Sequence, residues 1–194
     1  MDPLTHALAG ATLGWATTGS RLGRRSLAIG AAAALLPDVD VLIRSAADPL
    51  LAIEHHRGFT HSLLFVPVGG LIAALPFFAR LDRMQQRWAA LAGIIAYASH
   101  ALLDAATTYG TQLFWPFSNH RVGLDVISIL DPMFTLLTMV GVLAALNARR
   151  RLVTIAIAIA IVWLAAGFVQ RERATAAQSR LASTRGERVT RGAV

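Results

Sequence analysis

The chain has no cysteine among its 194 residues, so neither a disulfide framework nor a metal site built on thiolates can form. Charge is also scarce, because only 15% of the residues are charged, against about 25% in an average soluble domain. Lysine is absent as well, and all 18 basic residues are arginine. Apolar residues, by contrast, make up 55% of the chain, and the mean hydropathy is +0.55. This composition excludes an ordinary soluble domain and predicts an integral membrane protein.

Apolar stretches of helical character predict an all-α fold, a polytopic helical membrane bundle with about four to six membrane-embedded helices. These stretches are residues 4–18, 26–36, 62–79, 88–103, 126–147 and 152–169. The second stretch rises only about 16 Å, roughly half the thickness of the hydrocarbon core, because Pro37 cuts it short. Either it starts at Arg24 and crosses with a tilt, or it is a half-helix whose end faces a wet cavity.

The apolar stretches and their loops use nearly all of the chain, so residues 1–170 are expected to form a single membrane-embedded domain. The following residues are rich in Arg, Ala, Ser and Thr and show no apolar periodicity, which predicts an Arg-rich disordered tail over residues 171–194. The arginines lie in short clusters and not on one continuous face with interleaved aromatics. No direct nucleic-acid binding is therefore expected.

The arginines also predict the orientation in the membrane. Three short turns, 21–25, 80–87 and 149–151, contain three arginines each, and the positive-inside rule places them in the cytoplasm. The two long connections, 37–61 and 104–125, then lie with the N-terminus on the opposite side. The arginine-rich tail disagrees, and a cytoplasmic tail stays open if one apolar stretch is re-entrant.

Most of the histidines, together with several acidic residues, fall on this predicted non-cytoplasmic side, where ionisable groups near a membrane are costly and indicate a functional site. His100 and Asp104 lie four residues apart on a helix and so share one face, where an imidazole and a carboxylate can bind the same cation. Asp38 and Asp40 follow the helix-ending proline, and their side chains point the same way if the backbone is extended. The alternatives are a simple hydrogen-bonding pair for the first two residues and a solvated helix end for the two aspartates.

Further histidines come from other segments: His6 near the start, and His56 and His61 on either side of a glycine. His55 and His56 cannot easily face one point, and His56 is the favoured ligand. Histidine and aspartate without sulfur fit zinc, and also manganese or iron. The sequence thus predicts one or two divalent ions, with zinc favoured and manganese as an alternative. The candidate metal ligands are His6, Asp38, Asp40, His56, His61, His100 and Asp104.

At these residues the chain resembles a known family. The strings LLPDVD at residues 35–40 and HRGFTHS at residues 56–62, with His100-xxx-Asp104 and His6, are similar to the YdjM-like family of bacterial inner-membrane proteins, described as LexA-regulated, membrane-bound, metal-dependent hydrolases. The resemblance runs over about residues 1–132. More remotely, the pattern is similar to the all-helical superfamily of zinc-dependent phospholipase C and single-strand nucleases.

The remote resemblance implies a ligand set. Asp38 or Asp40, with His61, His100 and Asp104, would hold one ion, while His6 and Asp104 would contact a second, which makes Asp104 a bridging ligand. Later ligands of that superfamily are missing here, and only His120 is left to substitute for them. A cluster of three metal ions is therefore not expected.

The first hypothesis for function is a membrane-bound metal-dependent hydrolase that acts on a phosphoester of a lipid or nucleotide. Asp38 and Arg57 are its candidate catalytic residues: the aspartate acts as base, unless it is a ligand and Asp40 takes that role, and Arg57 orients phosphate through its planar fork. Arg57 could instead be an ordinary positive anchor. The expected location is the bacterial inner (cytoplasmic) membrane, multi-pass, with the metal site toward the non-cytoplasmic side and membrane lipids as partners.

The second hypothesis is a non-enzymatic membrane protein whose metal ion holds the bundle together or senses or moves ions. Coordination separates the two hypotheses, because a catalytic site keeps an open position for water and a structural site is closed. A third hypothesis, a membrane factor of the DNA-damage response that acts through a partner, follows only from the regulation that the family resemblance implies.

Overall fold

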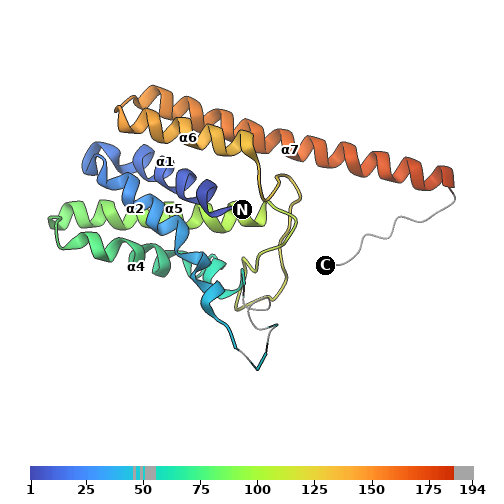
Figure 1. The fold of residues 1–194 in the computed structure, drawn as a ribbon, viewed down its shortest axis with the longest axis horizontal. Coiled ribbons are helices and arrows are strands. Elements are labelled where there is room, and N and C mark those ends of the chain that lie inside the picture. Colours follow the sequence, from blue (N-terminus) through green and yellow to red (C-terminus); the bar gives the residue numbers. More distant parts are fainter. Residues whose placement is uncertain (46, 49, 51–55, 186–194) are drawn as a thin grey trace.

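The fold is a bundle of α-helices packed side by side (Figure 1), which confirms the predicted all-α class. We analyse a computed structural model, which describes residues 1–45, 47, 48, 50 and 56–185. The α-helices are α1 (Pro3–Leu22), α2 (Arg25–Leu35), α4 (Val66–Phe78), α5 (Arg83–Ala105), α6 (Pro132–Leu146) and α7 (Arg150–Arg185). Two 3-10 turns, η1 (Pro37–Leu42) and η2 (Phe59–His61), lie between α2 and α4.

Local sequence explains where several helices begin and end. Asp2 caps α1, since its carboxylate accepts a hydrogen bond from the backbone of Thr5. Asp82 and Gln85 form a capping box that starts α5 at Arg83, five residues before the apolar stretch from which the helix was predicted. Polar capping residues thus extend the helices beyond their apolar parts.

Two helices in the described part of the chain are long and apolar enough to cross a bilayer, namely α5 and α7. The apolar helices α2, α4 and α6 are shorter, at 10–17 residues. The predicted number of four to six membrane-embedded helices is therefore not confirmed. The two candidates differ in their surroundings. In the apolar part of α5, 61% of the residues are buried, whereas in that of α7 only 11% are buried.

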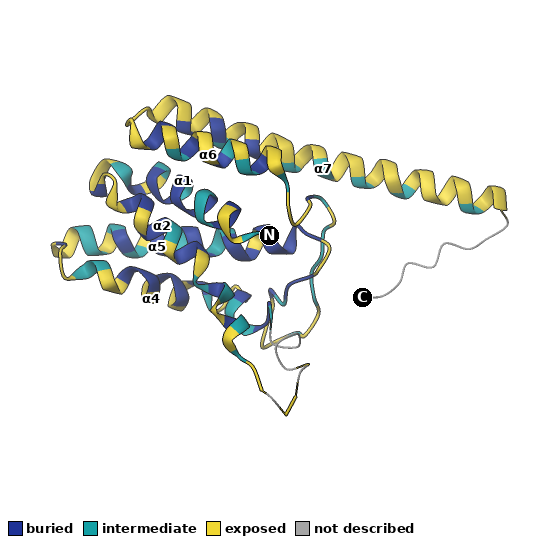
Figure 2. Ribbon diagram, viewed as in Figure 1, coloured by how far each residue is buried: buried dark blue, intermediate teal, exposed yellow. Residues whose placement is uncertain are grey.

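The outer surface of the bundle is apolar. Many residues of α4, α6 and α7 are exposed (Figure 2). Large hydrophobic side chains are common among them, more than is usual on a water-facing surface. They include Leu71, Ile72, Leu75, Leu136, Met139, Val140, Leu143, Ile155, Ile159, Ile161, Val162 and Phe168. Such a belt is the surface that a bilayer covers.

The arginine-rich turns gather at one end of the bundle, and the long connections lie at the other end (Figure 1). Arg24 donates a hydrogen bond to the carbonyl of Leu146 at 3.0 Å, and Arg25 donates one to the carbonyl of Arg80 at 3.5 Å. These contacts join all three short turns. The basic turns and the connections that carry the histidines are therefore separated by the length of the bundle.

Glycine lets the helices of the bundle approach closely. A Cβ atom on Gly30 of α2 would lie 2.2 Å from the carbonyl oxygen of Gly10 on α1, and one on Gly93 of α5 would lie 2.2 Å from that of Gly70 on α4. Helix interfaces in membranes are built in this way, since small residues bring backbones together. The close packing holds α1, α2, α4 and α5 in one compact group.

The predicted disordered tail is wrong for residues 171–185, which continue α7 as regular helix to Arg185. Alanine and arginine make up more than half of this segment, and these residues favour helix. Extending an existing helix also avoids the cost of nucleating a new one. The rest of the predicted tail, residues 186–194, lies outside the described residues.

We expect the substitution Gly30→Val to destabilise the bundle, because the new side chain would overlap the backbone of Gly10. The free energy of unfolding should fall by about 1–3 kcal/mol, as for other overpacked interiors. Ala28→Val is the matched control, since Ala28 is exposed on the same helix. Thermal unfolding in detergent measures both, and equal melting temperatures for the two variants would contradict the close helix contact.

Candidate metal centre

Four side chains that could bind a metal ion meet at the end of the bundle that carries the long connections. They are Asp38, His61, His100 and Asp104, and one nitrogen or oxygen atom from each lies within 4.8 Å of the others. We call them the His/Asp cluster. The turn η1 holds Asp38, the turn η2 holds His61, and α5 holds the other two one helical turn apart.

The cluster atoms are spaced like the ligands of a single tetrahedral ion. The Nε2 atoms of His61 and His100 are 2.9 Å apart, and each lies 3.4 Å from Oδ2 of Asp104. Oδ1 of Asp38 lies 3.4 Å from the His100 nitrogen and 3.7 Å from the His61 nitrogen. Ligands about 2.0–2.1 Å from a tetrahedral zinc ion are separated by about 3.3–3.4 Å. The spacing fits one small divalent ion.

Hydrogen bonds orient both imidazoles so that Nε2 faces the centre of the cluster. His100 donates from Nδ1 to the backbone carbonyl of Ala34 at 2.6 Å. His61 donates from Nδ1 to Oγ1 of Thr60 at 3.0 Å, and Thr60 donates in turn to Asp40 at 2.8 Å. A metal-binding imidazole is usually fixed by such a contact at its other nitrogen.

Asp40 lies behind the cluster and not within it. Its carboxylate accepts hydrogen bonds from the backbone N–H of Arg57 at 3.0 Å, from Nδ1 of His56 at 2.9 Å and from Thr60. Burial raises the pKa of Asp40, but the hydrogen bonds from His56 and Thr60 and the nearby imidazole of His61, whose Nδ1 lies 3.3 Å from Oδ2 of Asp40, outweigh it and hold the pKa below its usual range. The carboxylate is therefore ionised and already fully engaged.

The placement of Asp40 and His56 differs from the prediction that both are metal ligands. Asp40 is occupied by its donors, and His56 is occupied by Asp40. Both residues position the loop that carries Arg57 and His61. His55 lies outside the described residues, so the choice between the two adjacent histidines stays a prediction.

The two carboxylate oxygens of Asp104 have different surroundings. Its Oδ2 atom points into the His/Asp cluster, is buried, and has no hydrogen-bond partner among the described residues. Its Oδ1 atom contacts Nε2 of His6 at 3.0 Å and also the amino group of Met1. The imidazole of His6 stacks on that of His100, with ring centroids 3.7 Å apart. His6 is thus outside the four-ligand group but next to the carboxylate of Asp104.

The carboxylates make the cluster attractive to a cation. Burial lowers the pKa of His61, but the carboxylates of Asp104, Asp38 and Asp40 outweigh it and raise the pKa to about 10. Without a bound cation, His61 therefore carries an extra proton at neutral pH. A metal ion bound at the cluster would displace that proton.

Arg57 is buried beside the cluster. Its side chain is only 6% exposed, and its Nε atom lies 3.0 Å from Oδ2 of Asp104. Nη1 donates to Oγ1 of Thr107 at 2.9 Å, and the guanidinium lies over the ring of Tyr109 at 4.8 Å. The roles of Thr107 and Tyr109 could not be predicted from the sequence, because they depend on how the loop after α5 folds.

The cluster opens to solvent on one side. The side chain of Asp38 is 24% exposed, whereas those of the other three members are at most 1% exposed. His120, the expected substitute ligand, is exposed on the loop and does not join the described cluster. Among the described residues, Asp38 is therefore the member of the cluster that solvent reaches.

These features define a helical membrane protein with a buried candidate metal centre at one end of its bundle. The chain belongs to the YdjM inner membrane protein family, whose model matches residues 1–174. The membrane class predicted from composition is thereby confirmed, and the family resemblance with it.

Three relatives show the range of similarity. The chain is 35% identical to the inner membrane protein YbcI of Escherichia coli over 61% of this chain and 69% of YbcI. It is 31% identical to the uncharacterized protein YfhP of Bacillus subtilis, over 68% of this chain and 42% of YfhP. The inner membrane protein YdjM of Escherichia coli is 32% identical over 42% of this chain and 44% of YdjM. The matches thus span less than half of two of these relatives.

No solved structure matches the chain significantly. The remote similarity to the phospholipase C and nuclease superfamily therefore stays a prediction. The same holds for the identity of the metal and for hydrolase activity.

We expect protein purified in detergent to bind about one equivalent of zinc or manganese, and the double substitution His100→Ala with Asp104→Ala to abolish this binding. Asp40→Asn should weaken the affinity by about 10- to 100-fold without abolishing it, because it removes a support of His61 and no ligand. His120→Ala is the control. Elemental analysis and a metal titration measure these effects, and stoichiometric metal in the double variant would refute the centre.

Proposed function

We propose that the chain is a membrane-bound hydrolase that uses a divalent metal ion at the His/Asp cluster to cleave a phosphoester. The observation that carries this proposal is the buried guanidinium of Arg57, 3.0 Å from the ligand oxygen of Asp104. A cation beside a cation site opposes metal binding, so a purely structural site gains nothing from it. The arrangement becomes favourable once an anion binds between the metal ion and the arginine.

Phosphate is the anion that this pair suits best. The guanidinium has a planar fork of donors that matches phosphate oxygens, and Tyr109 and Thr107 hold it in place. A bound divalent ion would supply a water of lowered pKa and stabilise charge on the phosphoryl oxygens. The opening beside Asp38 lets the phosphoester enter from the membrane surface.

Asp38 is the candidate base, because it is the cluster member that solvent reaches. One of its oxygens faces the imidazoles of His61 and His100, which leaves the second oxygen to accept a proton from the attacking water. Asp40 is a weaker candidate for this role, since its side chain is buried and engaged by several donors. Asp40 instead orients His61 through Thr60.

A second candidate function rests on the completeness of the His/Asp cluster. Four protein ligands at tetrahedral spacing are typical of closed structural zinc sites. A metal ion of this kind would join η1, η2 and α5 and would stabilise the bundle or report on ion concentration. Cobalt substitution separates the two functions, because adding inorganic phosphate changes the visible spectrum of an open site and leaves that of a closed site unchanged.

We expect turnover of p-nitrophenyl phosphate or its diester by the metal-loaded protein, and Arg57→Gln should raise KM by about 10- to 100-fold with a smaller effect on kcat. The reason is that Arg57 binds the phosphate in both the ground state and the transition state. Arg44→Gln is the matched control, since Arg44 is exposed in the loop after η1. Inert metal-loaded protein with a phosphate-insensitive cobalt spectrum would establish the structural function instead.

We also propose a multi-pass topology in which the arginine-rich turns face the cytoplasm and the His/Asp cluster faces the opposite side. The separation of these features to opposite ends of the bundle supports it (Figure 1). A reporter inserted near Asn119 should give a periplasmic signal, and one near Arg83 a cytoplasmic signal. The reverse pattern would place the cluster in the cytoplasm.

A further inference from the structure

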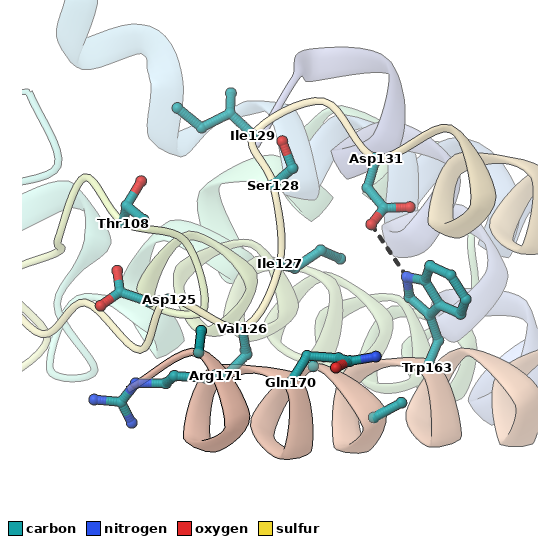
Figure 3. A pocket seen from close by; sticks show the side chains of 13 residues that line it. Thr108, Asp125, Val126, Ile127, Ser128, Ile129, Asp131, Trp163, Gln170 and Arg171 are labelled. Atoms are coloured by element: carbon teal, nitrogen blue, oxygen red, sulfur yellow. Dashed lines mark hydrogen bonds between the residues drawn. The ribbon is translucent and has the colours of Figure 1, made fainter. Parts of the chain in front are cut away.

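A cavity of about 680 Å³ lies between α7 and the loop that precedes α6 (Figure 3). This volume falls within the range of about 300–1,000 Å³ that is typical of ligand sites. The cavity lies beside the end of the apolar run of α7, where Val169 gives way to Gln170 and Arg171. It therefore lies where a membrane-crossing α7 would leave the hydrocarbon core.

Close packing and hydrogen bonds fix the walls of the cavity. A Cβ atom on Gly167 would lie 2.0 Å from the carbonyl oxygen of Val126, so glycine is required for the loop to approach α7 this closely. The backbone N–H of Val126 donates to the carbonyl of Ala106 at 3.0 Å, which ties the loop to the end of α5. At the other side, Trp163 donates from Nε1 to Asp131 at 3.1 Å (Figure 3).

The lining combines apolar side chains with charges of both signs. Val126, Ile127 and Ile129 supply apolar surface, and Asp125 and Arg171 supply one negative and one positive group. Asp125 and Arg171 lie on the same side of the cavity in Figure 3. Neither forms a salt bridge within the part of the chain that the structure describes.

We infer that this cavity binds the headgroup of a phospholipid that carries a primary ammonium group, as phosphatidylethanolamine does. The phosphate would pair with Arg171 and the ammonium with Asp125, so that both charges are complemented. The acyl chains would continue along the exposed apolar surface of α7, at residues such as Ile159 and Val162. Trp163 also lines the cavity, and tryptophan is common near the membrane interface.

Other headgroups match the lining less well. An anionic headgroup without an ammonium group leaves Asp125 unpaired and close to a second negative charge. A choline headgroup has no N–H to donate to the carboxylate. The combination of one acid and one base therefore selects a zwitterion with a hydrogen-bond donor.

The test uses the full-length protein in mild detergent, titrated separately with phosphatidylethanolamine, phosphatidylglycerol and phosphatidylcholine, with bound lipid counted by native mass spectrometry. We expect one phosphatidylethanolamine to bind about tenfold more tightly than either of the others. Arg171→Gln should lower its affinity by about tenfold or more, and Asp125→Asn should remove the preference over phosphatidylcholine. Arg173→Gln is the matched control, because Arg173 is exposed on the same helix and does not line the cavity.

Equal binding of the three lipids, or equal effects of Arg171→Gln and Arg173→Gln, would show lipid of the general belt only and would overturn the proposal. A preference for phosphatidylglycerol would overturn the role of Asp125 and the zwitterionic ligand. The variant His61→Ala should keep the lipid selectivity, because its side chain lies in the His/Asp cluster and does not line the cavity.

Discussion

The hydrogen bond from His100 to the carbonyl of Ala34 is the contact on which the geometry of the candidate metal centre depends. The last turn of a helix leaves carbonyl groups without intrahelical partners, and α2 ends at Leu35, just before Pro37. One of these free carbonyls fixes the ring of His100 and joins α2 to α5. The glycines and alanines between the helices make this close approach possible, so packing and ligand geometry follow from one constraint.

Burial determines how the charged groups of the centre must be paired. Charged groups in a low-dielectric interior are stable only when they are paired or bind a cation. Asp40 meets this requirement with donors from its own loop, whereas Oδ2 of Asp104 lacks a hydrogen bond and faces two imidazoles. The guanidinium of Arg57, which the loop before η2 carries, supplies a positive charge 3.0 Å from this oxygen. The same arrangement therefore presents a buried carboxylate oxygen to a cation and keeps a buried arginine beside it.

The sequence predicts the membrane class, the helices and all four members of the cluster, together with three further candidate ligands. His100 and Asp104 could be paired from their spacing alone, because helical geometry fixes which residues share a face. The choice between Asp38 and Asp40 could not be made, since it depends on how η1 turns back against η2. The burial of Arg57 and the roles of Tyr109 and Thr107 depend on a loop without periodicity. The sequence does not predict the helical end of α7, because its polar composition indicates disorder although its residues favour helix.

The length of α7 has a mechanical consequence. Its 36 residues extend for about 54 Å, while the hydrocarbon core is only about 30 Å thick. A helix that crosses the bilayer and continues unbroken acts as a stiff spacer, and it projects beyond the end of the bundle that carries the His/Asp cluster (Figure 1). The end of a membrane-crossing α7 at Arg185 is therefore held roughly 20 Å beyond the hydrocarbon core, at a distance set by a rigid helix and not by chain entropy.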